Sequence, residues 1–154
     1  MSSALPFPVR NPFVEALGLE LERFEAGVAE VSLTLQPEQL NAFGVAHGGV
    51  CMTMLDVAMA HAVRSQHRHE PDGGPGVVTV EMKSSFLRPG EGRLRACARV
   101  LHASATLAFV EGELLDPSGV RVAHATGTFK LMRRLPTRGR SIRQQTATGS
   151  GQAG

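Results

Sequence analysis

The sequence predicts an α+β domain in which one long apolar helix lies on a curved antiparallel sheet of about five to six strands. A proline-free stretch at 48–64 is rich in apolar helix formers. The segments before and after it have strand-like patterns separated by turn signals. A chain of 154 residues is long enough for one domain with its own core. One domain with a helix packed against one face of a sheet is therefore expected.

Two strands are expected before the helix. The elements predicted there are an arm at 1–13, a short helix or turn at 13–17, and strands at 19–24 and 31–35. Val31, Leu33 and Leu35 alternate with polar residues, which is typical of a half-buried strand. Gly27 marks the turn between the two strands, and Pro37 ends the second.

The helix is followed by a linker and a run of strands. The apolar residues at 48–64 fall on nearly every helical face, which predicts that protein surrounds the helix. Prolines and glycines in the linker at 67–76 end it. The strands expected after the linker are at 77–87, 93–102, 107–115 and 120–132. Their connections are short enough for antiparallel neighbours. Arg93, Arg95 and Arg99 alternate with apolar residues, so one face of the sheet should be wet.

Composition narrows the classes of function. The formal charge is only +2, and the chain has no Trp or Tyr to stack on bases, which argues against nucleic-acid binding. No run of 18 apolar residues is present, so we expect no membrane span. The start of the chain lacks the apolar core of a signal peptide, and Cys51 and Cys97 form no disulfide framework, which favours the cytoplasm. His67 and His69 have no third ligand nearby, so no metal is expected. The segment 134–154 is predicted to be a disordered basic tail.

Asp56 is the residue that points to chemistry. It lies among apolar residues of the predicted helix, and a buried carboxylate is either paired with another group or functional. The loop before the helix contains Asn41, His47, Gly48 and Gly49. Free backbone N–H groups at a helix N-terminus can bind an oxyanion, and glycine permits close approach. Taken alone, a His-Gly-Gly run is more often a simple turn.

The spacing of these two features has a geometric consequence. Gly48 and Asp56 are eight residues apart, or about 12 Å along a helix at ~1.5 Å per residue. One subunit cannot bring both to the same carbonyl group. If both act on one substrate, Asp56 must meet Gly48 of a second copy, which predicts a symmetric dimer with two shared sites.

The run NAFGVAHGGVCMTMLDVAMAHA and the later run VVTVEMKSSFLRPG resemble hotdog-fold acyl-CoA thioesterases of the phenylacetyl-CoA thioesterase family. With the strand order, the resemblance covers roughly 17–132 and implies a hotdog domain at 14–133. It further implies hydrolysis of an acyl-CoA to the free acid and CoA, no cofactor beyond the CoA of the substrate, and a homotetramer built from two dimers. Aspartate rather than glutamate at position 56 favours the phenylacetate-type group over the 4-hydroxybenzoyl-CoA group.

The resemblance also assigns roles to individual residues. Gly48 matches the residue that polarises the thioester carbonyl, and Asp56 the nucleophile or general base. The supporting residues are Asn41, which helps hold the thioester, His47, which orders the loop, and Thr79, which helps position the water. The residues expected at the CoA are Arg88, Gly49, Ser104 and Thr106. Thr79 is equally readable as an ordinary strand residue. Many relatives carry a Gly-Arg or Gly-Lys pair before the fifth strand, where this chain has His-Ala-Ser-Ala-Thr at 102–106.

Several alternatives remain open at this stage. The acyl group is aromatic, such as phenylacetyl or hydroxyphenylacetyl, or of medium chain length. The same carboxylate serves an anhydride intermediate or general-base attack by water. A non-catalytic acyl-CoA-binding module and a hotdog dehydratase or hydratase are the competing functions.

Overall fold

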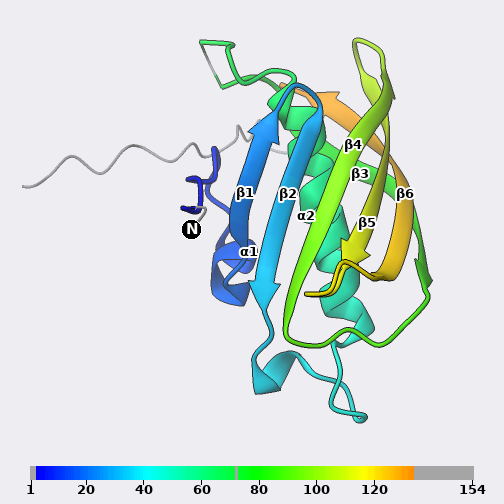
Figure 1. Ribbon diagram of the computed structural model, residues 1–154. Coiled ribbons are helices and arrows are strands. Elements are labelled where there is room, and N and C mark those ends of the chain that lie inside the picture. Colours follow the sequence, from blue (N-terminus) through cyan, green and yellow to red (C-terminus); the bar gives the residue numbers. More distant parts are fainter. Residues whose placement is uncertain (1–2, 72, 134–154) are drawn as a thin grey trace, which may run out of the picture.

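The computed structural model describes residues 3–71 and 73–133 (Figure 1). In chain order the elements are α1 (Pro12–Leu17), β1 (Glu20–Glu25), β2 (Val28–Thr34), the 3-10 helix η1 (Pro37–Gln39), α2 (Gly48–Ser65), β3 (Gly76–Phe86), β4 (Arg93–Ala103), β5 (Leu107–Leu115) and β6 (Arg121–Met132). This arrangement confirms the predicted α+β class with one long helix. The predicted tail at 134–154 lies outside the described residues.

The strands form one antiparallel sheet in the order β1-β2-β4-β5-β6-β3. The sheet curves around α2, which lies across one of its faces (Figure 1). We call the face that contacts α2 the inner face and the opposite one the outer face. The sheet is not closed, and β1 and β3 are its two edge strands. Among the described residues β3 pairs only with β6, which leaves its other side open to a further strand.

Small residues on the inner face allow the helix to approach the sheet. Ala29, Ala98, Gly112 and Ala125 pair in one row across four strands. A Cβ atom at Gly112 would lie 3.3 Å from side-chain atoms of both Leu55 and Met59, which come from α2. Their side chains are fully buried. Larger residues in this row would push the helix away, so the row sets the depth at which α2 is held.

One face of α2 remains open, in contrast to the prediction that protein surrounds the helix. Met52 is 39% exposed, and Gly49 on the same side is also exposed. Thr53 and Asp56 are half-buried. The apolar pattern predicted burial correctly for the sheet side. An apolar pattern does not tell whether a helix face is buried by the same chain or by a second copy of it.

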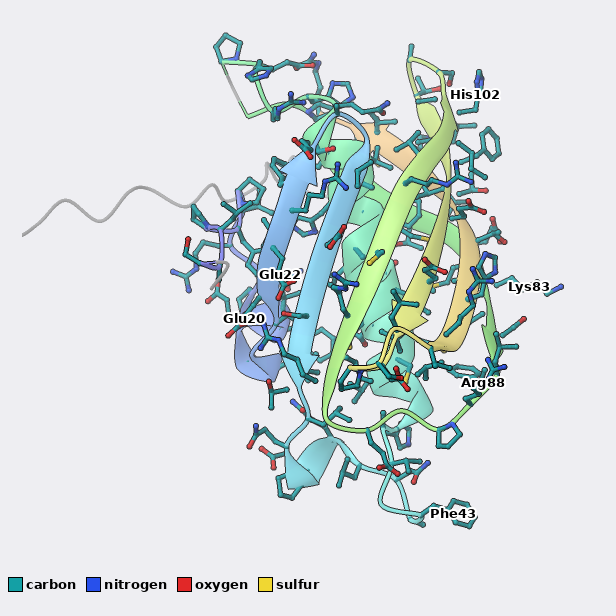
Figure 2. The ribbon with its side chains drawn as sticks, in the orientation of Figure 1. Glu20, Glu22, Phe43, Lys83, Arg88 and His102 are labelled. Carbon is teal, nitrogen blue, oxygen red and sulfur yellow. The ribbon has the colours of Figure 1, made fainter. Side chains whose placement is uncertain are left out.

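The outer face is charged, as the alternation of arginines predicted. Arg93 donates to Glu20 and Glu22 at 2.6 and 2.8 Å, and Figure 2 shows these two glutamates together on β1. Such exposed ion pairs contribute little to stability and mainly keep this face wet. Among the residues described, no helix is both long and apolar enough to span a membrane.

Candidate functional site

The loop before α2 is shaped by the side chain of Asn41. Its Oδ1 accepts hydrogen bonds from the backbone N–H groups of Phe43 and Val45, at 2.9 and 3.4 Å. The backbone N–H of Asn41 donates to the carbonyl of Val45 at 2.8 Å. Phe43 stands at the tip of this loop, 91% exposed (Figure 2). The sequence assigned the Asn41 side chain to the thioester. Its amide oxygen holds the loop, and its NH₂ group is the part left to contact a ligand.

His47 caps the N-terminus of α2. Its Nδ1 accepts a hydrogen bond from the backbone N–H of Gly49 at 2.9 Å, so Nδ1 is the unprotonated ring nitrogen. No hydrogen bond among the described residues uses the N–H of Gly48. The two glycines therefore differ: the Gly49 amide is occupied by His47, whereas the Gly48 amide is available at the positive end of the helix.

The ring of Phe86 covers Gly48. A Cβ atom at position 48 would lie 3.6 Å from two ring carbons of Phe86. This contact places an apolar ring beside the first residue of α2. The sequence analysis missed Phe86. The signal was present, because Met82, Ser84 and Phe86 alternate toward the inner face of β3.

Asp56 lies further along the open face of α2 and is held by Thr79. Thr79 Oγ1 donates to Asp56 Oδ1 at 2.6 Å, which joins two residues that the sequence had assigned to one site. Burial raises the pKa of Asp56, and the hydrogen bond from Thr79 partly opposes this effect. Within the described part of the chain, no arginine, lysine or histidine forms an ion pair with Asp56. A half-buried carboxylate without a cationic partner is more typical of a functional site than of a structural pair.

The expected CoA-binding residues do not all lie together. Arg88 is at the same end of the sheet as the loop before α2. Its guanidinium donates to the carbonyl of Arg121 at 2.9 Å. Nearby, the carbonyl of Gly90 accepts a hydrogen bond from the backbone N–H of Ala46, which belongs to that loop. Ser104 and Thr106 are at the other end, where Ser104 Oγ accepts from backbone groups of the β4–β5 turn. Figure 2 shows the separation through the labelled Arg88 and His102. Arg88 and the pair Ser104 and Thr106 therefore lie at opposite ends of the sheet.

The other titratable groups do not build a second centre. His67 Nδ1 pairs with Glu70 at 2.6 Å in the linker after α2. Cys51 is buried, and burial raises the pKa of its thiol, as expected for a packing residue. No group of three His, Cys, Asp or Glu side chains in the described ranges is arranged to hold a metal ion.

One helix wrapped by a single antiparallel sheet defines the hotdog fold, and the comparisons with known proteins agree. Residues 43–123 match the family model described as Thioesterase superfamily, and this match covers more than half of the chain. The chain belongs to this superfamily and is a thioester hydrolase of the hotdog class.

Similar proteins support the assignment along most of the chain. The medium/long-chain acyl-CoA thioesterase YigI of Salmonella typhimurium is 33% identical over 80% of this chain and 87% of its own length. The acyl-coenzyme A thioesterase PaaI of Escherichia coli is 30% identical over 71% of this chain and 74% of its own. Among solved structures, the conserved protein PA5202 of Pseudomonas aeruginosa superposes with a TM-score of 0.74 at 33% identity, covering 81% of this chain and 97% of that one.

Proposed function

We propose that this protein hydrolyses acyl-CoA thioesters, with Asp56 as the catalytic carboxylate and the Gly48 N–H polarising the carbonyl. The observation that carries the proposal is the hydrogen bond of 2.6 Å from Thr79 to a half-buried Asp56 on the open face of α2. The names of YigI and PaaI, both acyl-CoA thioesterases, support the substrate class.

The chemistry needs only groups that the chain supplies. The thioester carbonyl oxygen accepts the hydrogen bond of Gly48 at the positive end of α2, where the negative charge that develops on this oxygen is stabilised. In the general-base route, Asp56 takes a proton from a water molecule while the oxygen of that water bonds to the carbonyl carbon. The C–S bond then breaks, and the CoA thiolate receives the proton. In the nucleophilic route, the Asp56 carboxylate bonds to the carbonyl carbon, CoA leaves, and water hydrolyses the anhydride.

A second copy completes this site. Because Gly48 and Asp56 are about 12 Å apart along one helix, the carbonyl that Gly48 binds is attacked by Asp56 of another subunit. The open edge of β3 and the open face of α2 are the surfaces for this contact. Val78 and Val80 of β3 are 38% and 58% exposed, and Met52 of α2 is also exposed. A twofold dimer formed through these surfaces covers them and creates two shared sites. A tetramer of two such dimers is the assembly that the family resemblance implies.

Within this dimer we assign the CoA phosphates to Arg88. It lies at the same end of the sheet as the loop before α2, and its side chain is exposed. Ser104 and Thr106 can reach that CoA only from another subunit. Gly49 serves the helix cap through His47 and contributes to CoA binding only by its lack of a side chain.

The similar proteins guide the choice of acyl group. YigI, named for medium and long chains, matches this chain with higher identity and over a longer span than PaaI does. We therefore place medium- and long-chain acyl-CoAs before phenylacetyl- and hydroxyphenylacetyl-CoA as substrates. A cytoplasmic location suits a CoA ester hydrolase whose two cysteines are free.

The test is thiol release from a panel of acyl-CoAs of different chain lengths, phenylacetyl-CoA and hydroxyphenylacetyl-CoA. Asp56→Asn is compared with Asp116→Asn, which makes the same change in the exposed turn between β5 and β6. We expect Asp56→Asn to lose at least about a hundredfold in kcat and Asp116→Asn to retain wild-type turnover. Equal, slow hydrolysis by all three proteins with retained binding of acyl-CoA would instead identify a non-catalytic binding module.

A further inference from the structure

The pairing of β3 with β6 changes register next to the catalytic carboxylate. Thr79 pairs with Phe129, but the next pair is Glu81 with Thr128, which leaves Val80 unpaired as a bulge. On the Gly76 side of the bulge, Val77 and Thr79 share the inner face. On the Phe86 side, the inner positions are 82, 84 and 86, and Glu81 and Lys83 face outward. Figure 2 shows Lys83 pointing away from α2.

The extra residue decides which way Thr79 points. Side chains alternate along a regular strand, so positions 79, 81 and 83 would all share one face. Without the bulge, Thr79 would join Glu81 on the outer face and could not reach Asp56. The hydrogen bond of 2.6 Å between Thr79 and Asp56 therefore depends on one inserted position, Val80.

Two features of β6 fit the bulge closely. Gly127 pairs with Met82, just past the bulge, and a Cβ atom at this position would be 3.2 Å from the carbonyl oxygen of Glu81 and 3.0 Å from the ring of Phe129. On the outer face, Thr128 Oγ1 donates to Glu81 Oε1 at 2.7 Å. The first feature lets the strands approach, and the second ties Glu81 to the outer face immediately after the extra residue.

We propose that the Val80 bulge, held by the Thr128–Glu81 hydrogen bond and the close approach at Gly127, is the element that aims Thr79 at Asp56. Thr128 is thus a positioning residue, since it acts on the site through β3 and touches neither Asp56 nor substrate. This inference deepens the proposed function and rests on the catalytic role of Asp56.

Loss of the bulge geometry should change the pH dependence of kcat. Thr79 lowers the pKa of Asp56 against the effect of burial, so loss of this hydrogen bond raises that pKa. Because the carboxylate must be ionised to act, the acid limb of the kcat profile then moves to higher pH. A general loss of stability without a change in the aim of Thr79 leaves this limb in place.

The experiment compares pH profiles of kcat for the full chain carrying Thr79→Val, Thr128→Val or Thr128→Ser, and for the double variant with both valines. The matched control is Thr126→Val, which makes the same change on the outer face of β6, one outward position away. We expect Thr79→Val to move the acid limb to higher pH and lower kcat about fivefold, as for loss of one hydrogen bond of ~1 kcal/mol. Thr128→Val should shift the limb in the same direction, whereas Thr128→Ser and Thr126→Val should resemble the wild type.

The double variant separates positioning from a structural effect. If Thr128 acts through Thr79, Thr128→Val adds nothing to the profile of Thr79→Val. A profile of Thr128→Val equal to that of Thr126→Val, or a further loss in the double variant, would overturn the inference and leave the role of Asp56 intact. Full turnover by Asp56→Asn would overturn the proposed function, and this inference with it.

Discussion

The buried imidazole of His61 makes the stability of the fold depend on pH. The ring packs edge-on against Phe7 and Phe24, with centroids 5.1 and 6.3 Å away. Its Nδ1 lies 2.8 Å from the carbonyl oxygen of Val57, and because a carbonyl can only accept, Nδ1 carries the proton. Nε2 is buried and has no partner among the described groups. The charged group that bears on the ring is the Arg64 guanidinium, which also disfavours a second proton.

The size of the effect follows from the pKa. Burial lowers the pKa of His61 from 6.5 to about 4. Between these values the unfolded chain binds a proton that the folded chain does not, so the free energy of unfolding decreases as the pH falls through this window. At about 1.4 kcal/mol per pKa unit, the contribution lost is about 3 kcal/mol. This contribution of neutral His61 to the free energy of unfolding is fully present above pH 6.5 and is lost below about pH 4.

Urea denaturation between about pH 4 and pH 7 measures this loss directly. The variant His61→Leu does not titrate, so its free energy of unfolding should vary less across the window, by about 3 kcal/mol. His69→Leu, which alters an exposed histidine, is the matched control and should keep the wild-type dependence. Two protein concentrations separate unfolding from subunit dissociation. If His61→Leu and wild type lose stability in parallel as the pH falls, His61 does not carry the effect and the reasoning is wrong.

Three other substitutions test the inner face, the loop and the carboxylate. Gly112→Val should lower the free energy of unfolding by about 1–3 kcal/mol in urea denaturation, because its side chain meets Leu55 and Met59, and an unchanged midpoint would contradict the close approach. Asn41→Ala should reduce kcat/KM about fivefold, since the loop before α2 loses an acceptor worth ~1 kcal/mol that holds it in place. Asp56→Asn should melt no lower than the wild type at pH 7, because a carboxyl group whose pKa is raised on folding destabilises the fold above that pKa. A clearly lower melting temperature would mean that the charge is stabilising.

The local parts of the fold could be predicted from the sequence. The helix predicted at 48–64 is α2 (Gly48–Ser65), and the four strands predicted after it match β3 to β6 in number and order. Apolar periodicity, glycine and proline act over a few residues, so they are readable along one chain. Gly27, the expected turn residue, does sit between β1 and β2 and has a positive φ of 89°.

The features that depend on pairing could not be predicted in the same way. The change of phase between Val77, Thr79 and the later positions 82, 84 and 86 is visible in the sequence, but it identifies a bulge only once β6 is known to be the partner. The side-chain bonds of Asn41 likewise depend on how the loop closes onto itself. Single residues could therefore be assigned to a site from the sequence, whereas the contacts that orient their side chains could not.

The spacing of Gly48 and Asp56 on one rigid helix also locates the twofold axis of the proposed dimer. Two copies of α2 must run antiparallel for each Gly48 to meet the other copy's Asp56, and the axis then passes the midpoint between them, which is position 52. Met52 lies on that same open face and is exposed in the single chain. Packed helices have their axes about 8–10 Å apart, and each Cα atom lies about 2.3 Å from its own axis. Cα atoms that face each other across the contact are therefore close enough for a disulfide. Met52→Cys should therefore cross-link two subunits under oxidation, whereas the wild type, with buried Cys51 one residue away, should not. Absence of the cross-link in a dimeric Met52→Cys protein would place the axis elsewhere and separate Gly48 from Asp56 of the partner.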